Sequence, residues 1–271
     1  MNIEKQLLYL ISKVEKIEGK TLITIFEQMN YTQQTIRNVL TKLKKDQFIT
    51  SPQRAFYQIT SLGIETIQSF YSKRNYYTES WDKKWYIAII EIPETERKKR
   101  DLFRRSILQL GFGSLYKSVY IYPWNITERL LSLIDTLEIE NYVTLLSSNE
   151  FILNGVSVEG SSGIFKADTI WELDKIHALY EEKYNWFLHD FKHKVSSYNK
   201  SDQLHPLYVF IHYLELIEVI HELLIVDPML PPDYLPGNWI GAKVLAEFQN
   251  CSNTLAKLIP PESFYYQFVK K

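Results

Sequence analysis

Apolar residues in the first 75 positions recur at the intervals of short helices and are followed by two strand-like runs. Helices are predicted from Ile3 to Val14 and from Leu22 to Met29, with a turn at residues 18–20 between them. A third helix is predicted after Thr32, whose side chain is placed to cap its first turn. The apolar stripe of this third helix consists of Ile36, Val39, Leu40 and Leu43.

Two strands, 48–50 and 55–60, are predicted on either side of a basic turn that holds Arg54, and a fourth helix starts at Leu62. This order predicts a winged helix-turn-helix over residues 1–75. In that fold the third helix enters the major groove, and the wing reaches the backbone or the minor groove. A small protein-interaction domain with a solvated polar face is the alternative. The residues expected to contact DNA are Thr32, Gln33, Gln34, Thr35, Arg37, Asn38, Lys42, Lys45 and Arg54.

Strand and helix patterns alternate through residues 80–160. Helices are predicted from Arg97 to Leu110 and from Thr127 to Leu137, and Gly111-Phe112-Gly113 ends the first of them. The β-α-β-α-β pattern predicts a ferredoxin-like sheet with helices on one face. We expect this unit to carry a dimer interface. Its strands are predicted at 85–91, 115–122 and 142–146.

The first of these helices carries a dense run of basic residues. One interpretation is an anion site, because guanidinium groups match the geometry of phosphates. The other is a solvated helix face paired with Glu94, Glu96 and Asp101, which is what charge runs usually form. The run comprises Arg97, Lys98, Lys99, Arg100, Arg104 and Arg105.

Residues 161–271 are predicted to form a helical C-terminal domain, which makes the whole chain an α+β protein. Aromatic-rich helices are expected at 168–195 and 207–226, with a Pro-rich connector at 227–239 and another helix at 240–249. The pairs His189 with His193 and Glu218 with His221 have spacings that metal ligands can use, but neither has the glutamate of a metalloprotease motif. We predict no catalytic residue, no metal site and no cofactor.

Charge is distributed unevenly along the 271 residues, although the net charge is only -1. Residues 1–75 hold eleven Lys or Arg and six Asp or Glu, so this end carries +5 and the remainder -6. A polyanion would therefore meet the N-terminal end. Cys251 is the only cysteine, and the apolar run 207–226 is interrupted by charged residues and histidines. We expect a cytoplasmic protein without membrane association.

Several specific motifs are distributed over the middle and C-terminal parts of the chain. Trp81-Asp82-Lys83-Lys84-Trp85 opens the middle unit, and Trp171-Glu172-Leu173 precedes Tyr180. The most specific motifs lie at the connector: Asp227-Pro228, Leu230-Pro231, Leu235-Pro236 and Trp239-Ile240-Gly241. Together they resemble the PaaX family of transcriptional repressors, over essentially the whole chain. The resemblance implies a homodimeric repressor with a winged helix, a ferredoxin-like middle domain similar to CRISPR adaptation endoribonucleases, and a helical C-terminal domain.

The resemblance also implies double-stranded operator DNA as the partner and an acyl-coenzyme A effector such as phenylacetyl-coenzyme A, which releases the repressor. Cationic side chains near aromatic ones suit a ligand with phosphates and an apolar acyl group. The alternative function is a metal-dependent nuclease, in which Glu91 would stand imperfectly for the aspartate at the end of the first middle strand. The residues expected to hold the effector are Trp81, Trp85, Arg97, Arg100 and Arg104.

Overall fold

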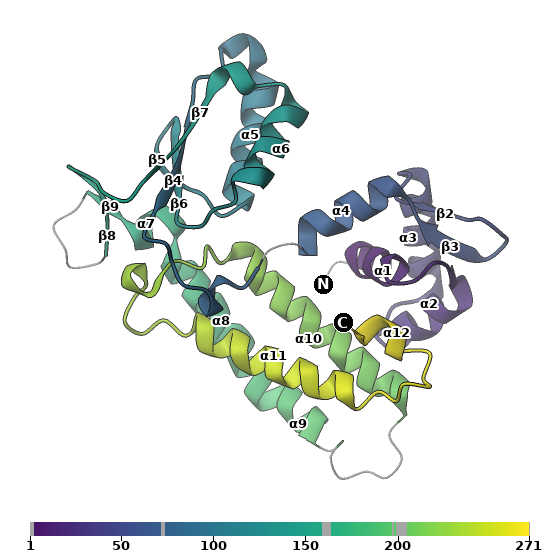
Figure 1. Ribbon diagram of the computed structural model, residues 1–271. Helices are drawn as coiled ribbons and strands as arrows, with labels where there is room; N and C mark the ends of the chain where they lie inside the picture. The colour runs from purple at the N-terminus through teal and green to yellow at the C-terminus, as the bar shows by residue number, and fades with distance from the viewer. Residues whose placement is uncertain (1–2, 72–73, 159–163, 197, 199–204, 271) are drawn as a thin grey trace. The chain divides into compact units, whose positions relative to one another are not determined.

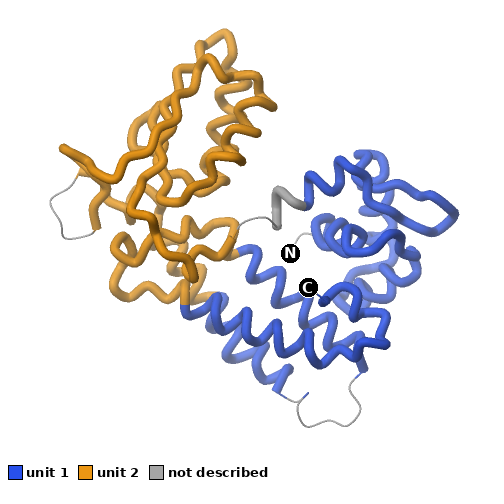
Figure 2. The backbone as a smooth tube through the Cα atoms, in the orientation of Figure 1, with its two compact units in different colours: residues 1–73, 183–222, 243–271 blue, residues 74–182, 223–242 orange. Residues whose placement is uncertain are grey.

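The computed structural model describes residues 3–71, 74–158, 164–196, 198 and 205–270, and the chain divides into two units (Figures 1 and 2). Unit 1 consists of residues 1–73, 183–222 and 243–271, and unit 2 of residues 74–182 and 223–242. Helices from the last third of the chain thus contribute to both units. The division into domains 1–75, 80–160 and 161–271 stays a prediction.

The N-terminal part of unit 1 consists of four helices and a three-stranded antiparallel sheet of order β1-β3-β2. The third helix, its cap and the two later strands agree with the predicted pattern. The predicted turn at residues 18–20 was wrong, because Ile17 and Glu18 form a strand that pairs with Phe56 and Tyr57, and the second helix starts at once. The elements are α1(Ile3–Ser12), β1(Ile17–Glu18), α2(Gly19–Glu27), α3(Gln33–Lys45), β2(Ile49–Thr50), β3(Phe56–Ile59) and α4(Ser61–Tyr71).

A small apolar core fixes α3 in this part of the chain. Ile36, Leu40 and Leu43 of the predicted apolar stripe are buried on one side of α3, and Val39 is half-buried. Leu7, Leu22 and Phe26 from α1 and α2 are completely buried in the same unit. The start of α4 lies so close to the residue before β2 that a Cβ atom at Gly63 would come within 2.1 Å of the Phe48 carbonyl oxygen.

The remaining residues of unit 1 form a helical assembly that is held by aromatic side chains. Phe187 packs on Phe248 with ring centroids 4.7 Å apart, and Phe210 packs on Phe268 at 5.3 Å. The elements are the end of α8(Leu173–Trp186), a π-helical turn (Phe187–Phe191), α9(Lys192–Ser196), most of α10(Pro206–Val226), α11(Gly241–Lys257) and α12(Tyr266–Val269). The helix predicted at 240–249 therefore extends further, since its sequence contains no helix breaker before Pro260.

Unit 2 is built on an antiparallel sheet of order β5-β6-β4-β7 with two helices on one face (Figure 1). Ala88, Phe103 and Tyr122 belong to the buried core between this sheet and the helices. The single strand predicted at 115–122 was wrong, because the chain reverses at Lys117 and Ser118 and forms two paired strands. The elements are β4(Trp85–Ile90), α5(Arg97–Gln109), β5(Gly113–Tyr116), β6(Val119–Tyr122), α6(Thr127–Leu137) and β7(Val143–Ser148).

The opposite face of the sheet is covered at β5 by α7(Ala167–Trp171), which follows the short parallel pair β8(Val156–Ser157) and β9(Phe165–Lys166). A Cβ atom at Gly113 would come within 2.2 Å of the Ile170 side chain, so only glycine permits this approach. Trp171 donates a hydrogen bond of 2.9 Å to the carbonyl oxygen of Gly111. Helix α7 is thereby held against the sheet.

A buried carboxylate joins three distant segments of unit 2. Asp227 is completely buried, and its Oδ2 accepts hydrogen bonds from the hydroxyl groups of Tyr77 at 2.7 Å and Tyr180 at 2.6 Å. Its Oδ1 accepts the backbone N–H of Met229 at 2.7 Å. Trp239 donates its indole N–H to the Tyr77 hydroxyl at 2.7 Å. These four side chains, Tyr77, Tyr180, Asp227 and Trp239, are called the Asp227 cluster below.

Candidate nucleic-acid interface

Helix α3 presents a continuous polar face to solvent. Thr32 stands before the helix in extended conformation, and its Oγ1 accepts the backbone N–H of Thr35 at 3.1 Å. This cap satisfies one of the free N–H groups of the first turn and fixes where the helix begins. The predicted DNA-binding residues of this segment are all exposed: Thr32, Gln33, Gln34, Thr35, Arg37, Asn38, Lys42 and Lys45.

The polar side chains of α3 differ in what they contact. Gln33 donates to the carboxylate of Glu27 at 2.8 Å, so part of its capacity is used within the protein. Lys42 forms an ion pair of 2.6 Å with Glu4 of α1. Arg37 is exposed, and its guanidinium makes no hydrogen bond or ion pair with the residues that the structure describes. The guanidinium of Arg37 is therefore available to an external anion, whereas Lys42 would first have to leave Glu4.

The hairpin between β2 and β3 carries the remaining predicted contact, Arg54, in an exposed position. Ala55 next to it adopts a left-handed conformation with φ of 65°, and the Phe56 N–H donates to the Gln53 carbonyl at 3.1 Å. The sequence interpretation missed Lys16, which precedes β1 and lies over the Phe56 ring at 5.7 Å from its centroid. Nothing in the sequence placed Lys16 beside the hairpin, because strand β1 was not predicted.

The predicted effector residues do not form one cluster. Trp85 begins β4 and is only 2% exposed, and the indole N–H of Trp81 donates to the Pro123 carbonyl at 2.9 Å. Arg97 begins α5, which follows the other end of the same six-residue strand. At about 3.3 Å per residue, the two ends of β4 are roughly 17 Å apart. The structure therefore places Trp85 and Arg97 beyond opposite ends of β4.

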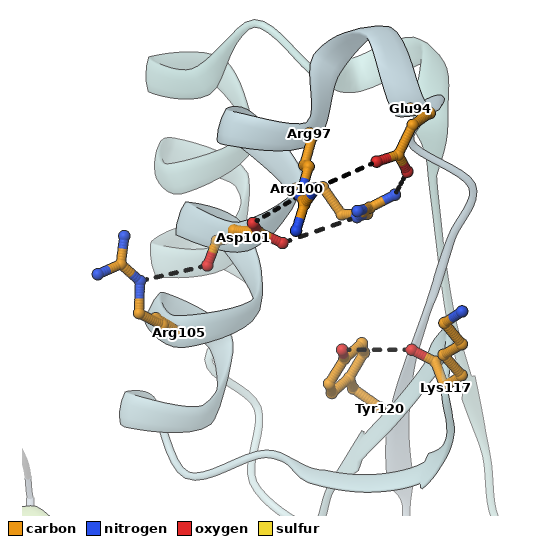
Figure 3. Close-up of polar contacts among 7 residues, drawn as sticks. All are labelled: Glu94, Arg97, Arg100, Asp101, Arg105, Lys117 and Tyr120. Carbon is orange, nitrogen blue, oxygen red and sulfur yellow. Dashed lines mark hydrogen bonds and ion pairs between the residues drawn. The ribbon is translucent and has the colours of Figure 1, made fainter.

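The arginines at the start of α5 are paired with carboxylates (Figure 3). Arg100 contacts Glu94 at 2.6 Å, and Arg97 lies 3.7 Å from Asp101. The hydrogen bond from Arg100 lowers the pKa of Glu94 below its ordinary value. Arg104 is exposed further along the helix. These contacts correspond to the solvated, internally paired face that charge runs usually form.

Unit 2 also contains a cavity of about 310 Å³ beside the Pro-rich connector. Asp168 and Asp233 are among its lining residues, and one carboxylate oxygen of Asp168 is buried without a hydrogen bond from any described residue. Its described lining contains no lysine or arginine, so negatively charged phosphates would meet like charge there. The lining residues are Val158, Ala167, Asp168, Leu173, Asp233, Tyr234, Leu235, Pro236, Gly237 and Asn238.

The histidine pairs do not assemble into larger sites in the described part of the chain. A π-helical turn at Phe187–Phe191 interrupts the helix between His189 and His193. His221 stacks edge-on against Tyr9 of α1, with ring centroids 6.5 Å apart. No group of three His, Cys, Asp or Glu residues among those described could hold a metal ion. No helix in the described ranges has the length and apolar character needed to cross a bilayer.

Comparisons with known proteins give the same family as the motifs. Residues 78–157 match the model of the PaaX protein central Cas2-like domain, and residues 171–260 match the PaaX-like protein C-terminal domain. The chain therefore belongs to the PaaX family. Transcriptional repressor PaaX of Escherichia coli is 22% identical over 247 residues, which cover 89% of this chain and 73% of that protein.

A solved structure of an uncharacterised protein from Mycobacterium tuberculosis is similar to this chain, with a TM-score of 0.54 and 18% sequence identity. The similarity covers 89% of each chain. At this identity the similarity concerns the fold alone. It agrees with an α+β architecture that extends across almost the whole chain.

Proposed function

We propose that this protein is a DNA-binding transcriptional regulator whose N-terminal residues act as a winged helix-turn-helix. In this proposal α3 lies in the major groove, and the β2–β3 hairpin is the wing that carries Arg54 to the DNA backbone. The observation that carries the proposal is the exposed polar face of α3, with Arg37 at its centre, on a helix anchored by Ile36, Leu40 and Leu43. The net charge of +5 over residues 1–75 supports it.

The other parts of the chain are proposed to take the roles that the family suggests. The β-α-β-β-α-β unit is proposed to be ferredoxin-like and to hold the interface of a homodimer, and the helical segments form the C-terminal domain. A dimer would place two recognition helices on half-sites about 34–36 Å apart, or a multiple of that distance. A regulator that acts on bacterial DNA would work in the cytoplasm.

The relation to a transcriptional repressor supports repression as the mode of regulation. We further propose an aromatic-acid catabolic operon of the phenylacetate type as the target, with an acyl-coenzyme A as the releasing effector. Phosphates bound at Arg97 and Arg100 would have to displace Glu94 and Asp101, and the acyl group could not reach Trp85 across the length of β4 without an extended pose. Titration of phenylacetyl-coenzyme A into a protein–DNA complex tests this part: release supports it, and undiminished DNA binding at millimolar ligand contradicts it.

A nuclease is the second candidate function, because residues 78–157 match a family model that is described as a Cas2-like domain. Glu91 directly follows β4, is exposed, and uses its backbone N–H to bind the Tyr142 carbonyl at 2.9 Å. Incubation of duplex DNA and of RNA with magnesium or manganese separates the two functions. Cleavage that disappears in Glu91→Gln would favour the nuclease, and intact nucleic acid favours the regulator.

Alanine substitution tests the proposed interface. Arg37→Ala should weaken binding to a selected duplex by ~1–3 kcal/mol, since a bidentate base or phosphate contact is lost. Arg105→Ala is the matched control, because Arg105 is an exposed arginine of α5 that bonds only the Asp101 carbonyl in the described structure. If the folded Arg37→Ala protein and the wild type bound the duplex with equal affinity, the proposed recognition of DNA by α3 would be contradicted.

A further inference from the structure

Two side-chain amides on the exposed face of α3 are bonded to each other. The Nε2 group of Gln34 donates to Oδ1 of Asn38 at 2.8 Å, one helical turn along. Both residues are exposed, and they lie on either side of Arg37 along the chain. Gln33 differs from them, because it bonds Glu27 of α2 instead. Gln34 and Asn38 therefore form a pair that is separate from the rest of the unit.

The bond between the two amides leaves a defined set of donors and acceptors. The Oδ1 atom of Asn38 has a second lone pair, and its Nδ2 group keeps two N–H donors. The Asn38 amide thus still offers one acceptor and one donor side by side, while Gln34 restricts its rotation. A side chain that is already oriented loses less conformational entropy when it binds.

Only one base offers the matching edge in the major groove. Adenine presents N7 as an acceptor and N6–H₂ as a donor, which an asparagine amide can engage with two hydrogen bonds. Guanine presents two acceptors, N7 and O6, which suit arginine instead. The amide pair and Arg37 therefore differ in the bases that they can recognise.

We infer that Asn38 recognises an adenine in the major groove, through Oδ1 to N6 and Nδ2 to N7, and that Gln34 is a positioning residue that orients the Asn38 amide. This inference rests on the proposed function, since it requires α3 to lie in the major groove. It adds the specificity of that site: each half-site contains an A·T pair opposite Asn38.

The experiment selects binding sites from a pool of duplexes with a randomised segment, using the full-length wild-type protein. The inference predicts one A·T position per half-site at which replacement by G·C weakens binding by roughly 5- to 150-fold. Asn38→Ala should lose the preference at that position alone. Gln34→Ala should weaken the same preference by a smaller factor, while Gln109→Ala, at an exposed glutamine of α5 outside the proposed interface, should leave it intact.

Replacement of that adenine by 7-deaza-adenine, which lacks the N7 acceptor, provides a second readout. It should weaken binding of the wild type and have no effect on Asn38→Ala, because the two changes remove the same hydrogen bond. Equal thermal unfolding of the variants shows that they fold. Selected sites without such an A·T position, or an A·T preference that persists in Asn38→Ala, would overturn the inference.

The outcomes distinguish the inference from the proposed function. The wild type and every variant could bind random duplex in a salt-sensitive way without an adenine preference that depends on Asn38. That result would support a DNA-binding regulator and contradict the inferred role of Asn38. Failure of the wild-type protein to bind any duplex at low salt would contradict both the inference and the proposed function.

Discussion

The Asp227 cluster allows a prediction in which two chemically identical substitutions have different costs. Tyr180→Phe removes one hydroxyl donor from the buried carboxylate of Asp227. Hydrogen bonds to charged groups contribute about 1.5–3 kcal/mol, so the free energy of unfolding should fall by that amount. Tyr77→Phe removes a similar donor and also leaves the Trp239 indole N–H without its acceptor.

An orphaned buried polar group costs about 1–3 kcal/mol, and the half-buried indole N–H of Trp239 should add part of that cost. Tyr77→Phe should therefore cost more than Tyr180→Phe, although Tyr180 is completely buried and Tyr77 is only partly buried. The ordering follows from the number of hydrogen bonds that each hydroxyl group makes. Burial alone would predict the opposite order.

Urea unfolding followed by tryptophan fluorescence measures both costs, with attention to whether the two units unfold in separate transitions. Tyr86→Phe is the control, because its hydroxyl also donates to an aspartate, Asp82 at 2.8 Å, but in an exposed setting. Such a surface contact should contribute less than about 1 kcal/mol. A cost of Tyr180→Phe no greater than that of Tyr86→Phe, or a cost of Tyr77→Phe below that of Tyr180→Phe, would contradict this order.

Three further predictions concern unit 1. Gly63→Ala should destabilise it by about 1–3 kcal/mol in urea unfolding, because the new Cβ would meet the Phe48 carbonyl oxygen at 2.1 Å; a neutral result would contradict that packing. Ala55→Gly should raise the melting temperature, since φ of 65° costs alanine roughly 1–2 kcal/mol, which exceeds the entropy cost of glycine; Ala55→Val should lower it. Burial, with a smaller effect of Lys13, lowers the pKa of His221 from 6.5 to about 4. The unfolded chain then binds more protons between these values, so stability should fall as pH decreases from 6.5 to 4, and this loss should be smaller in His221→Phe. An unchanged pH profile in that variant would assign the loss to other groups; Glu218 would oppose it, because burial raises the pKa of that carboxyl.

Local signals were enough to predict several elements. Helix α6 occupies the predicted residues 127–137, and α5 ends where Gly111 was expected to stop it, with φ of 107° at that glycine. The Thr32 cap was predicted from the residue type and its position. These features depend on a few neighbouring residues, which the sequence displays directly.

Features that depend on distant partners were not predicted. Strand β1 has two residues and exists through its pairing with β3, some forty positions away. The reversal at Lys117–Ser118 contains neither glycine nor proline, so the apolar run read as one strand. Trp85 and Arg97 are near in sequence, but a strand between them places them apart. The two tyrosines that bond Asp227 lie 47 and 150 positions away, which no local pattern displays.

The salt dependence of DNA binding shows whether this protein contacts the phosphates of a duplex. A protein that neutralises several phosphates releases counterions, and log K then falls linearly with log salt concentration at a slope of about -0.9 per phosphate contact. Fluorescence anisotropy with a labelled random duplex between 50 and 200 mM salt, roughly the range over which such binding weakens steeply, gives this slope. We expect a steep negative slope that becomes about one unit shallower when Lys45 or Arg54 is replaced by alanine. An affinity that does not change with salt concentration, or no binding of the duplex at the lowest salt concentration, would contradict a DNA-binding function.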